Sequence, residues 1–245
     1  MSAGETGLMT TLLYLEDQYL KTCTATVASV ADDAVVLDRT ILYPLGGGQA
    51  SDTGTIVSGS QSWPITLARR QGDDVAHLAT GAAEALHAAD TVTVHLDWDR
   101  RYPMMKYHTA LHLLSHVAHE RYGAGITGND ITPERARIDL ALDELTPEMV
   151  ESIAQGTNEL ISAGLAVTCT SVPRAEAERL VNPEKTRLDL LPAHIETIRL
   201  VRVGTVDIDA CGGTHVANTK EIGGIVVAGT TNKGRGRKRM EIRLT

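Results

Sequence analysis

The sequence predicts an α+β protein: a small N-terminal β-barrel domain over residues 1–97, then a two-layer α/β domain with an antiparallel sheet over residues 98–245. Two observations lead to this expectation. Short β-like segments separated by glycine turns fill the first part of the chain, which is typical of a small barrel. Helical periodicity with capping signals begins near residue 98 and is mixed with further strands, which is typical of helices packed on one face of a sheet.

Length and composition limit the classes of function. The 245 residues suffice for two modest domains, each burying its own core. Aromatic residues make up 3% of the chain and Phe is absent, so Leu, Val, Ile and Ala must build the core. Because proteins that read single-stranded RNA stack bases on aromatic side chains, this scarcity argues against that class. The net charge of -8 means that any nucleic-acid role needs a local basic surface.

The chain reads as cytoplasmic. Its three cysteines stand at unrelated spacings, unlike a disulfide framework, and neither a signal peptide nor a membrane-length apolar stretch is visible. A cysteine in that compartment is available as a thiolate ligand or nucleophile. The first eight residues, Met1–Leu8, are polar and patternless, and we expect no regular structure there.

In the first half, alternating and apolar runs between turn signals predict strands. They are Thr22–Val30, Ala34–Leu37, Gly54–Val57, Ser62–Arg69 and Thr91–Leu96. Between them, Gly46, Gly47, Gly48 and Gln49 form a glycine-rich loop that breaks any regular element.

In the second half, Pro103 is predicted to open a helix that runs to Tyr122 and stops at Gly123. A second helix begins at Thr146-Pro147 and ends near Ala163. The remaining expected elements are a strand at Val167–Val172, a short helix at Arg174–Leu180, a strand at Ile195–Val203 and a final strand pair at Gly223–Gly229 and Arg239–Leu244.

Two residue pairs carry the chemistry. His108 and His112 stand four apart on the first predicted helix, so both imidazoles lie on one face and can offer nitrogens to one metal ion. Cys211 and His215 flank a Gly-Gly bend that can turn both toward one point. Each pair alone is weak evidence, and histidines without a metal remain an alternative. His116 lies about 80° around the helix from His108, so we expect it outside the ligand set.

A basic segment lies near the C-terminus. Between Lys233 and Arg243 there are six basic residues against one acid, with Arg235, Arg237 and Arg239 around a glycine loop. Composition alone favours a solvated charged strand, whereas Gly234 and Gly236 would let the backbone approach a phosphate.

Three motifs occur in one order: Gly46-Gly47-Gly48-Gln49, His108-Thr109-Ala110-Leu111-His112 and Cys211-Gly212-Gly213-Thr214-His215. Together they resemble the alanyl-tRNA editing family, which comprises the AlaX proteins and the editing domain of alanyl-tRNA synthetase. The resemblance covers about Leu13 to the C-terminus, and the order of the domains resembles the middle-sized AlaX class.

The resemblance implies one Zn²⁺ per chain, held by His108, His112, Cys211 and His215, and hydrolysis of the ester between tRNA(Ala) and a wrong amino acid, chiefly serine and also glycine. It places the reaction at Thr40, Gln49, His108 and Cys211, with Thr40 sensing the serine hydroxyl. We expect substrate binding at Gly46, Gly47, Gly48, Lys106, Arg235, Arg237 and Arg239.

Two positions depart from the family pattern. Lys106 replaces an Arg two residues before the first histidine, which keeps the charge but loses a bidentate contact. Leu45 replaces an acidic residue before the glycines. Four protein ligands also describe a closed structural zinc, whereas a catalytic zinc keeps one position open, and the sequence leaves both roles open.

Three alternatives stay open. The chain could deacylate Ser-tRNA(Thr), it could be a non-catalytic tRNA-binding module stapled by zinc, or it could be a hydrolase with Cys211 as nucleophile. The sequence does not predict the oligomeric state.

Overall fold

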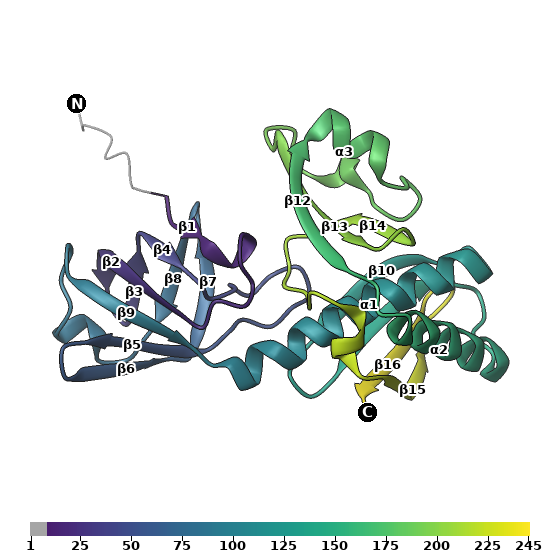
Figure 1. The fold of residues 1–245 in the computed structure, drawn as a ribbon, viewed down its shortest axis with the longest axis horizontal. Coiled ribbons are helices and arrows are strands. Elements are labelled where there is room, and N and C mark those ends of the chain that lie inside the picture. Colours follow the sequence, from purple (N-terminus) through teal and green to yellow (C-terminus); the bar gives the residue numbers. More distant parts are fainter. Residues whose placement is uncertain (1–8) are drawn as a thin grey trace. The chain divides into compact units, whose positions relative to one another are not determined.

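The computed structural model describes residues 9–245, which form two compact units (Figure 1). Unit 1 takes the described residues up to Gly46 together with Ala50–Arg101, and unit 2 takes Gly47–Gln49 together with Tyr102–Thr245. The expectation for Met1–Leu8 lies outside the described residues.

Unit 1 is built on one seven-stranded antiparallel sheet in the order β6-β5-β9-β2-β3-β8-β7. Its strands are β2 (Thr22–Ala31), β3 (Ala34–Leu37), β5 (Gly54–Ser58), β6 (Gln61–Ile65), β7 (Leu67–Gln71), β8 (Asp74–Leu78) and β9 (Thr91–Leu96). A short parallel pair, β1 (Thr11–Leu12) with β4 (Arg39–Thr40), and two 3-10 turns (Leu13–Leu15 and Ala82–Glu84) complete the unit. Within residues 9–245 no ladder joins β6 to β7, so the barrel is not confirmed, whereas the α+β class is.

The single strand expected at Ser62–Arg69 is wrong. The segment forms two strands, β6 and β7, that pair with different neighbours, β5 and β8. Thr66 lies at the break, and its N–H donates to Leu78 O at 2.9 Å. The interior of the unit is aliphatic, with Val27, Leu37 and Ile56 fully buried, as the absence of Phe requires.

Unit 2 contains two antiparallel sheets and three helices. The larger sheet has the order β10-β11-β16-β15 and the smaller the order β12-β13-β14. Its elements are α1 (Trp98–Tyr122, whose first turn belongs to unit 1), β10 (Gly125–Ile131), β11 (Ala136–Ala141), α2 (Pro147–Ser162), β12 (Val167–Pro173), α3 (Arg174–Leu180), β13 (Thr197–Val203), β14 (Asp207–Ala210), β15 (Ile225–Asn232) and β16 (Lys238–Leu244), with 3-10 turns at Leu188–Leu190 and Thr219–Ile222.

Helices α2 and α3 confirm their predictions, and the capping of α2 shows why. Thr146 precedes the helix and its hydroxyl accepts the N–H of Met149 at 3.3 Å, while Pro147 occupies the first position. These are the two signals by which a helix start is recognised from sequence. α3 packs on β12 and β13 of the smaller sheet (Figure 1).

Helix α1 begins at Trp98, five residues before the predicted start at Pro103. Asp97 caps the earlier start, because its Oδ1 accepts the N–H of Arg100 at 3.2 Å and its carbonyl accepts the N–H of Arg101 at 3.1 Å. Pro103 therefore lies inside the helix, where it cannot donate to the carbonyl of Asp99. The helix ends at Tyr122 and Gly123 follows with φ 64°, as expected.

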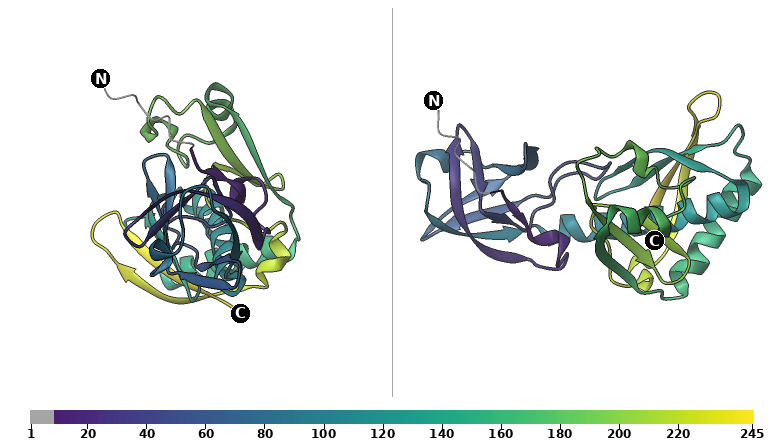
Figure 2. Two further views of the ribbon diagram at one scale, coloured as in Figure 1. Left: turned by 90° about the vertical axis from the view of Figure 1, so that its left-hand side faces the viewer. Right: turned by 90° about the horizontal axis from the view of Figure 1, so that it is seen from above.

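The predicted strand pair at the C-terminus exists as β15 and β16, joined by the basic glycine loop. Figure 2 shows this loop, in yellow, projecting from the rest of unit 2 in both views. None of the helices in residues 9–245 is long and apolar enough to span a bilayer.

Candidate metal centre

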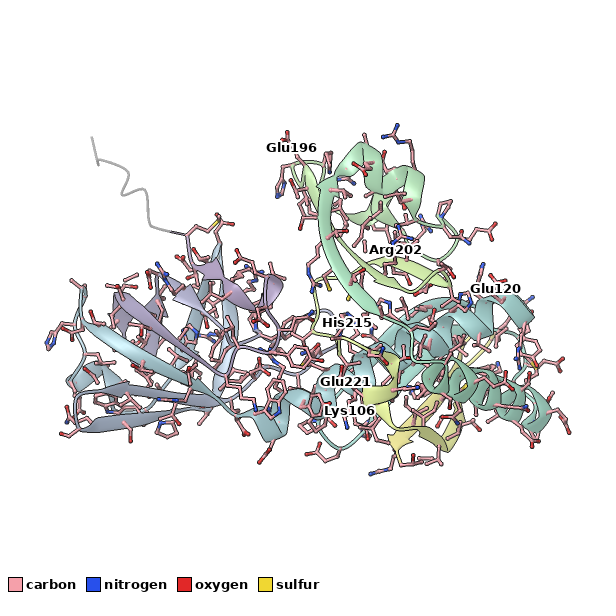
Figure 3. All side chains as sticks on the ribbon, viewed as in Figure 1. Lys106, Glu120, Glu196, Arg202, His215 and Glu221 are labelled. Carbon is pink, nitrogen blue, oxygen red and sulfur yellow. The ribbon has the colours of Figure 1, made fainter. Side chains whose placement is uncertain are left out.

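Four side chains that lie far apart in the sequence meet in unit 2. His108 and His112 stand one turn apart on α1, and Cys211 and His215 lie in the turn that follows β14. Their possible ligand atoms all lie within 4.8 Å of one another. The structure therefore brings together the four residues predicted as metal ligands, with His215 beside α1 (Figure 3).

The thiol of Cys211 is the point on which the rings converge. Its Sγ lies 3.3 Å from His108 Nε2 and 3.4 Å from His215 Nε2. The ring centroids of His108 and His215 are 4.4 Å apart, and those of His112 and His215 are 4.8 Å apart. One thiolate and three imidazoles at such spacing form the donor set that zinc prefers in proteins.

Hydrogen bonds at the far side of two rings set their orientation. His108 Nδ1 lies 2.8 Å from Gln49 Oε1, and His215 Nδ1 lies 3.2 Å from Thr109 Oγ1. Thr109 donates its own proton to Met105 O, so its oxygen accepts the ring N–H. Because Nδ1 carries the proton in both rings, Nε2 directs its lone pair toward Cys211, and these residues fit a metal ion.

Gln49 belongs to this centre through its fully buried side chain. Besides accepting from His108, its Oε1 accepts the N–H of Thr214 at 3.3 Å, and its Nε2 donates to Thr214 Oγ1 at 2.9 Å. The glycine loop before it must lie close to β10, since a Cβ on Gly48 would fall 1.5 Å from Asn129 Oδ1. Only glycine leaves that space, and Gly48 O accepts the N–H of Ile131 at 2.7 Å.

The turn that carries Cys211 and His215 is held by one arginine. Arg199 donates to the carbonyls of Cys211 at 2.6 Å and Gly213 at 3.0 Å. Gly213 packs against the first ligand, because a Cβ there would fall 2.0 Å from His108 Cε1. A Cβ on Gly212 would meet no described atom within 4 Å.

The charges in the centre favour cation binding. Although burial opposes ionisation, the rings of His108 and His215 lower the pKa of the Cys211 thiol well below its usual value. Burial and then His108 lower the pKa of His215 to about 3, which keeps that ring neutral. A thiolate beside a neutral imidazole suits metal binding. For His112, although burial opposes protonation, Asp207 raises the pKa to about 10, so that ring must lose a proton when it binds a metal ion.

A small cavity adjoins the two histidines of α1. It measures about 50 Å³ and is lined by His108, Leu111, His112, Ile126, Asn129, Ile138 and Asp209. Its wall is chiefly apolar, and Asn129 on β10 adds an amide. Asn129 was not predicted, because nothing in the sequence marks β10 as a strand.

The remaining predicted residues have separate surroundings. In unit 1 the buried Thr40 lies 2.8 Å from His77 Nε2, and its Oγ1 accepts the N–H of Leu42. Gly46 also belongs to unit 1, and its carbonyl accepts the hydroxyl of Tyr43, whereas Gly47, with φ 57°, belongs to unit 2.

Lys106 stacks on a ring of its own helix. Its Nζ lies 4.6 Å from the centre of the Tyr102 ring, and the Tyr102 hydroxyl donates to Glu221 Oε2 at 2.9 Å (Figure 3). The Lys106 ammonium therefore lies over the ring of a tyrosine whose hydroxyl is bonded to an acidic side chain.

The basic loop is partly neutralised inside unit 2. Arg239 makes two hydrogen bonds to Asp139, at 2.6 and 2.9 Å, and Arg237 lies 3.5 Å from the same carboxylate. The hydrogen bond from Arg239 holds the pKa of Asp139 below its usual value. Arg235, at the tip between Gly234 and Gly236, is exposed.

Comparison with known proteins places this geometry in a family. Residues 198–241 match the family described as "Threonyl and Alanyl tRNA synthetase second additional domain", and residues 9–100 match "tRNA synthetases class II (A)". The proteins similar along the whole chain include the alanyl-tRNA editing protein AlaX-M of Methanosarcina barkeri, 38% identical over 237 residues, covering 95% of this chain and 98% of that protein.

The AlaX-M protein of Saccharolobus solfataricus is 37% identical, with the same coverage of both chains. The alanine–tRNA ligase of Hyperthermus butylicus is 34% identical over 94% of this chain, which corresponds to 25% of that ligase. The fold and the motifs thus place the chain among relatives of aminoacyl-tRNA synthetases. The chain belongs to the alanyl-tRNA editing proteins of the AlaX-M type.

Proposed function

We propose that this protein is a trans-editing hydrolase that removes a wrong amino acid, chiefly serine and also glycine, from tRNA(Ala) in the cytoplasm. The observation that carries the proposal is the convergence of three imidazoles and one thiolate within 4.8 Å. The names of the relatives support alanyl-tRNA as the substrate. Residues 98–245 would form the editing domain and residues 1–97 an accessory barrel.

His108, His112, Cys211 and His215 would hold one zinc ion per chain. When bound, zinc would supply Lewis-acid polarisation of an ester carbonyl or of a water molecule. Gln49 would hold the His108 ring in place through its Oε1. Thr214 would in turn fix the Gln49 amide from both sides.

The small cavity beside His108 and His112 would take part of the aminoacyl ester, and at about 50 Å³ it leaves no room for a large group. Thr40 is not among its lining residues, so a contact of Thr40 with the serine hydroxyl would be made outside this cavity. Small amino acids are those that a synthetase for alanine cannot reject by size or by a single hydroxyl, so a second site is needed to remove them.

Thr40 would discriminate serine from alanine. Val35 O lies 3.0 Å from His77 Nδ1 and can only accept, so Nδ1 carries the proton and Nε2 accepts the hydroxyl proton of Thr40. The Thr40 hydroxyl thus donates its proton to His77, and one of its lone pairs accepts the N–H of Leu42. Toward a substrate, Thr40 Oγ1 can therefore only accept a hydrogen bond. Serine carries a hydroxyl that can donate to it, and alanine does not.

The glycines and basic residues would bind the RNA. Gly46, Gly47 and Gly48 would let the backbone approach the 3′ end of the tRNA. Lys106 with the exposed Arg235 and Arg237 would contact phosphates, whereas Arg239 would act by holding the loop through Asp139.

Deacylation of Ser-tRNA(Ala), Gly-tRNA(Ala) and Ala-tRNA(Ala) by the full chain tests the proposal. We expect rapid release of serine, slower release of glycine and sparing of alanine. Cys211→Ala should abolish release, and Cys23→Ala, a thiol of unit 1, serves as the matched control. If serine stays attached while the protein is folded and binds zinc, the proposed substrate is wrong.

Ser-tRNA(Thr) is a second candidate substrate, because the family matched at residues 198–241 is named for both synthetases. Faster release from tRNA(Thr) than from tRNA(Ala) would favour it. Two further alternatives make different predictions. A non-catalytic tRNA-binding module would bind without releasing serine, and a cysteine hydrolase would stay active after chelation.

A further inference from the structure

A group of buried charges lies beside Nδ1 of His112. Asp207 and Asp209 come from β14, and Lys185 and Thr186 from the segment after α3. The Lys185 ammonium contacts both carboxylates, and the Thr186 hydroxyl donates to Asp209 Oδ1. The side chains of Asp207 and Lys185 are 2% and 7% exposed, so this is an interior ion pair.

Two buried polar atoms at the edge of this group lie close together, and neither has a hydrogen-bond partner among the described residues. They are His112 Nδ1 and Asp207 Oδ2, which lie 3.5 Å apart. Leaving a buried donor and a buried carboxylate oxygen unpaired is costly, so a shift of a few tenths of an ångström that joins them is favourable.

The pairing completes a pattern set by the other two rings. His108 and His215 each have Nδ1 against a neutral oxygen, from Gln49 and Thr109. His112 has a carboxylate at the corresponding position. A charged acceptor makes an imidazole a stronger donor and fixes its tautomer more firmly than a neutral acceptor does.

The two aspartates and His112 also have the spacing of a metal-binding group, with Asp209 Oδ2 3.7 Å from His112 Nδ1. Their carboxylates already have a cation, the Lys185 ammonium, in contact with both. Lys185 thus holds Asp207 in place and partly neutralises its charge.

We propose that Asp207, held by Lys185, is the positioning residue of His112: it accepts the Nδ1 proton, directs Nε2 toward Cys211 and thereby raises the affinity of the centre for its metal. This inference rests on the proposed metal site. A structural ion pair between β14 and the segment at Lys185 would give the same contacts without affecting metal affinity, so the test measures affinity as well as stability.

The experiment is a zinc titration of the full chain in competition with a chromophoric chelator. We expect Asp207→Asn to weaken zinc binding about tenfold and Asp207→Ala up to about a hundredfold, the range seen when outer partners of metal-binding histidines are removed. Asp139→Asn is the matched control, since it also removes an acid paired with a basic side chain of unit 2 but lies on β11 and contacts Arg239. Its zinc affinity should equal that of the wild type.

The free energy of unfolding of the metal-free proteins shows how much each variant loses in stability, so that a loss of zinc affinity can be told apart from a loss of fold. If Asp207→Asn folds and binds zinc within twofold of the wild type, the inference is overturned and the cluster is structural. Should the variants not fold, nitrogen-15 spectra of the zinc-loaded wild type decide. His112 must then bind through Nε2 with Nδ1 protonated, and binding through Nδ1 would overturn the inference. If the wild type binds no zinc, the proposed metal centre itself is wrong.

Discussion

Buried histidines in this chain are oriented by what their Nδ1 atoms meet. Nδ1 of His77 in unit 1 faces a carbonyl, and Nδ1 of His108 and His215 in unit 2 face an amide oxygen and a hydroxyl. In each case the proton is fixed on Nδ1, and the Nε2 lone pair is directed toward Thr40 from His77 and toward Cys211 from His108 and His215. The same arrangement orients the contact of His77 with Thr40 in unit 1 and the proposed ligand set in unit 2.

His77 should make unit 1 sensitive to acid. Burial lowers its pKa to about 4 from an ordinary 6.5, so the unfolded chain binds the proton more readily than the folded one. The stability is fully present above pH 6.5 and is lost as the pH falls toward 4, by roughly 3 kcal/mol. Urea unfolding at several pH values measures this, with the fluorescence of Trp63 and Trp98 as the probe, since both lie in unit 1.

The variant His77→Gln provides the comparison, because Gln offers a donor and an acceptor but does not titrate in this range. Its unfolding free energy should fall less than that of the wild type between pH 7 and pH 4. Parallel pH profiles for the two proteins would show that His77 does not carry the acid sensitivity.

At the residue scale the sequence was informative where spacing encodes chemistry. Two residues four apart on a helix and two around a Gly-Gly bend predicted a common site, and their ligand atoms do meet. Thr109, Lys185 and Asp207 were missed, because their roles depend on contacts between distant segments. The one available signal was the pair of acids, Asp207 and Asp209, immediately before Cys211.

At the scale of elements, the centre depends on how closely the turn after β14 approaches α1. Gly213 is the residue that allows this approach, since a Cβ there would overlap the His108 ring. Arg199 on β13 ties the turn to the sheet through two carbonyls. The position of the turn is therefore fixed by its close packing on α1 and by its hydrogen bonds to the sheet.

Gly213→Ala should displace His108 and weaken zinc binding by at least tenfold, because an overlap of this size forces the ring to move. Gly212→Ala, one residue earlier, should bind zinc as the wild type does, since it meets open space among the described residues. Zinc affinity and circular dichroism of both variants check this. Equal affinities would mean that the turn adapts and that its close packing is not required.

Elements with capping signals were predictable and elements without them were not. Thr146 and Pro147 marked α2 correctly, whereas the start of α1 was misplaced because Asp97 is a cap that Pro103 obscured. β11 has alternating apolar residues, but it was not predicted because charged residues stand between them. β10 was not predicted because it contains two glycines. Neither strand has a local signal as strong as its pairing in the sheet.

At the level of the whole molecule, the net charge of -8 opposes the binding of a polyanion such as tRNA. A strongly acidic protein repels a polyanion except where a local basic surface faces it. The loop between β15 and β16 is such a surface, although Asp139 neutralises part of it. Within this loop, Arg235 and Arg237 are the exposed arginines that we propose to contact phosphates.

Replacing Arg235 and Arg237 together with Ala should raise the KM for Ser-tRNA(Ala) and leave kcat nearly unchanged. Each lost phosphate contact should reduce the slope of log affinity against log salt by about 0.7–0.9. Arg69→Ala with Arg70→Ala, two exposed arginines of β7, is the matched control. An unchanged salt slope would show that the loop is not part of the tRNA-binding surface.

Release of serine from Ser-tRNA(Ala), measured with protein stripped of metal and then reloaded with zinc, decides whether the proposed centre works through a metal ion. We expect one zinc ion per chain, loss of activity on stripping, and recovery on reloading in the wild type but not in Cys211→Ala. Full activity of the stripped wild-type protein would show that the four converging side chains serve the reaction without a metal.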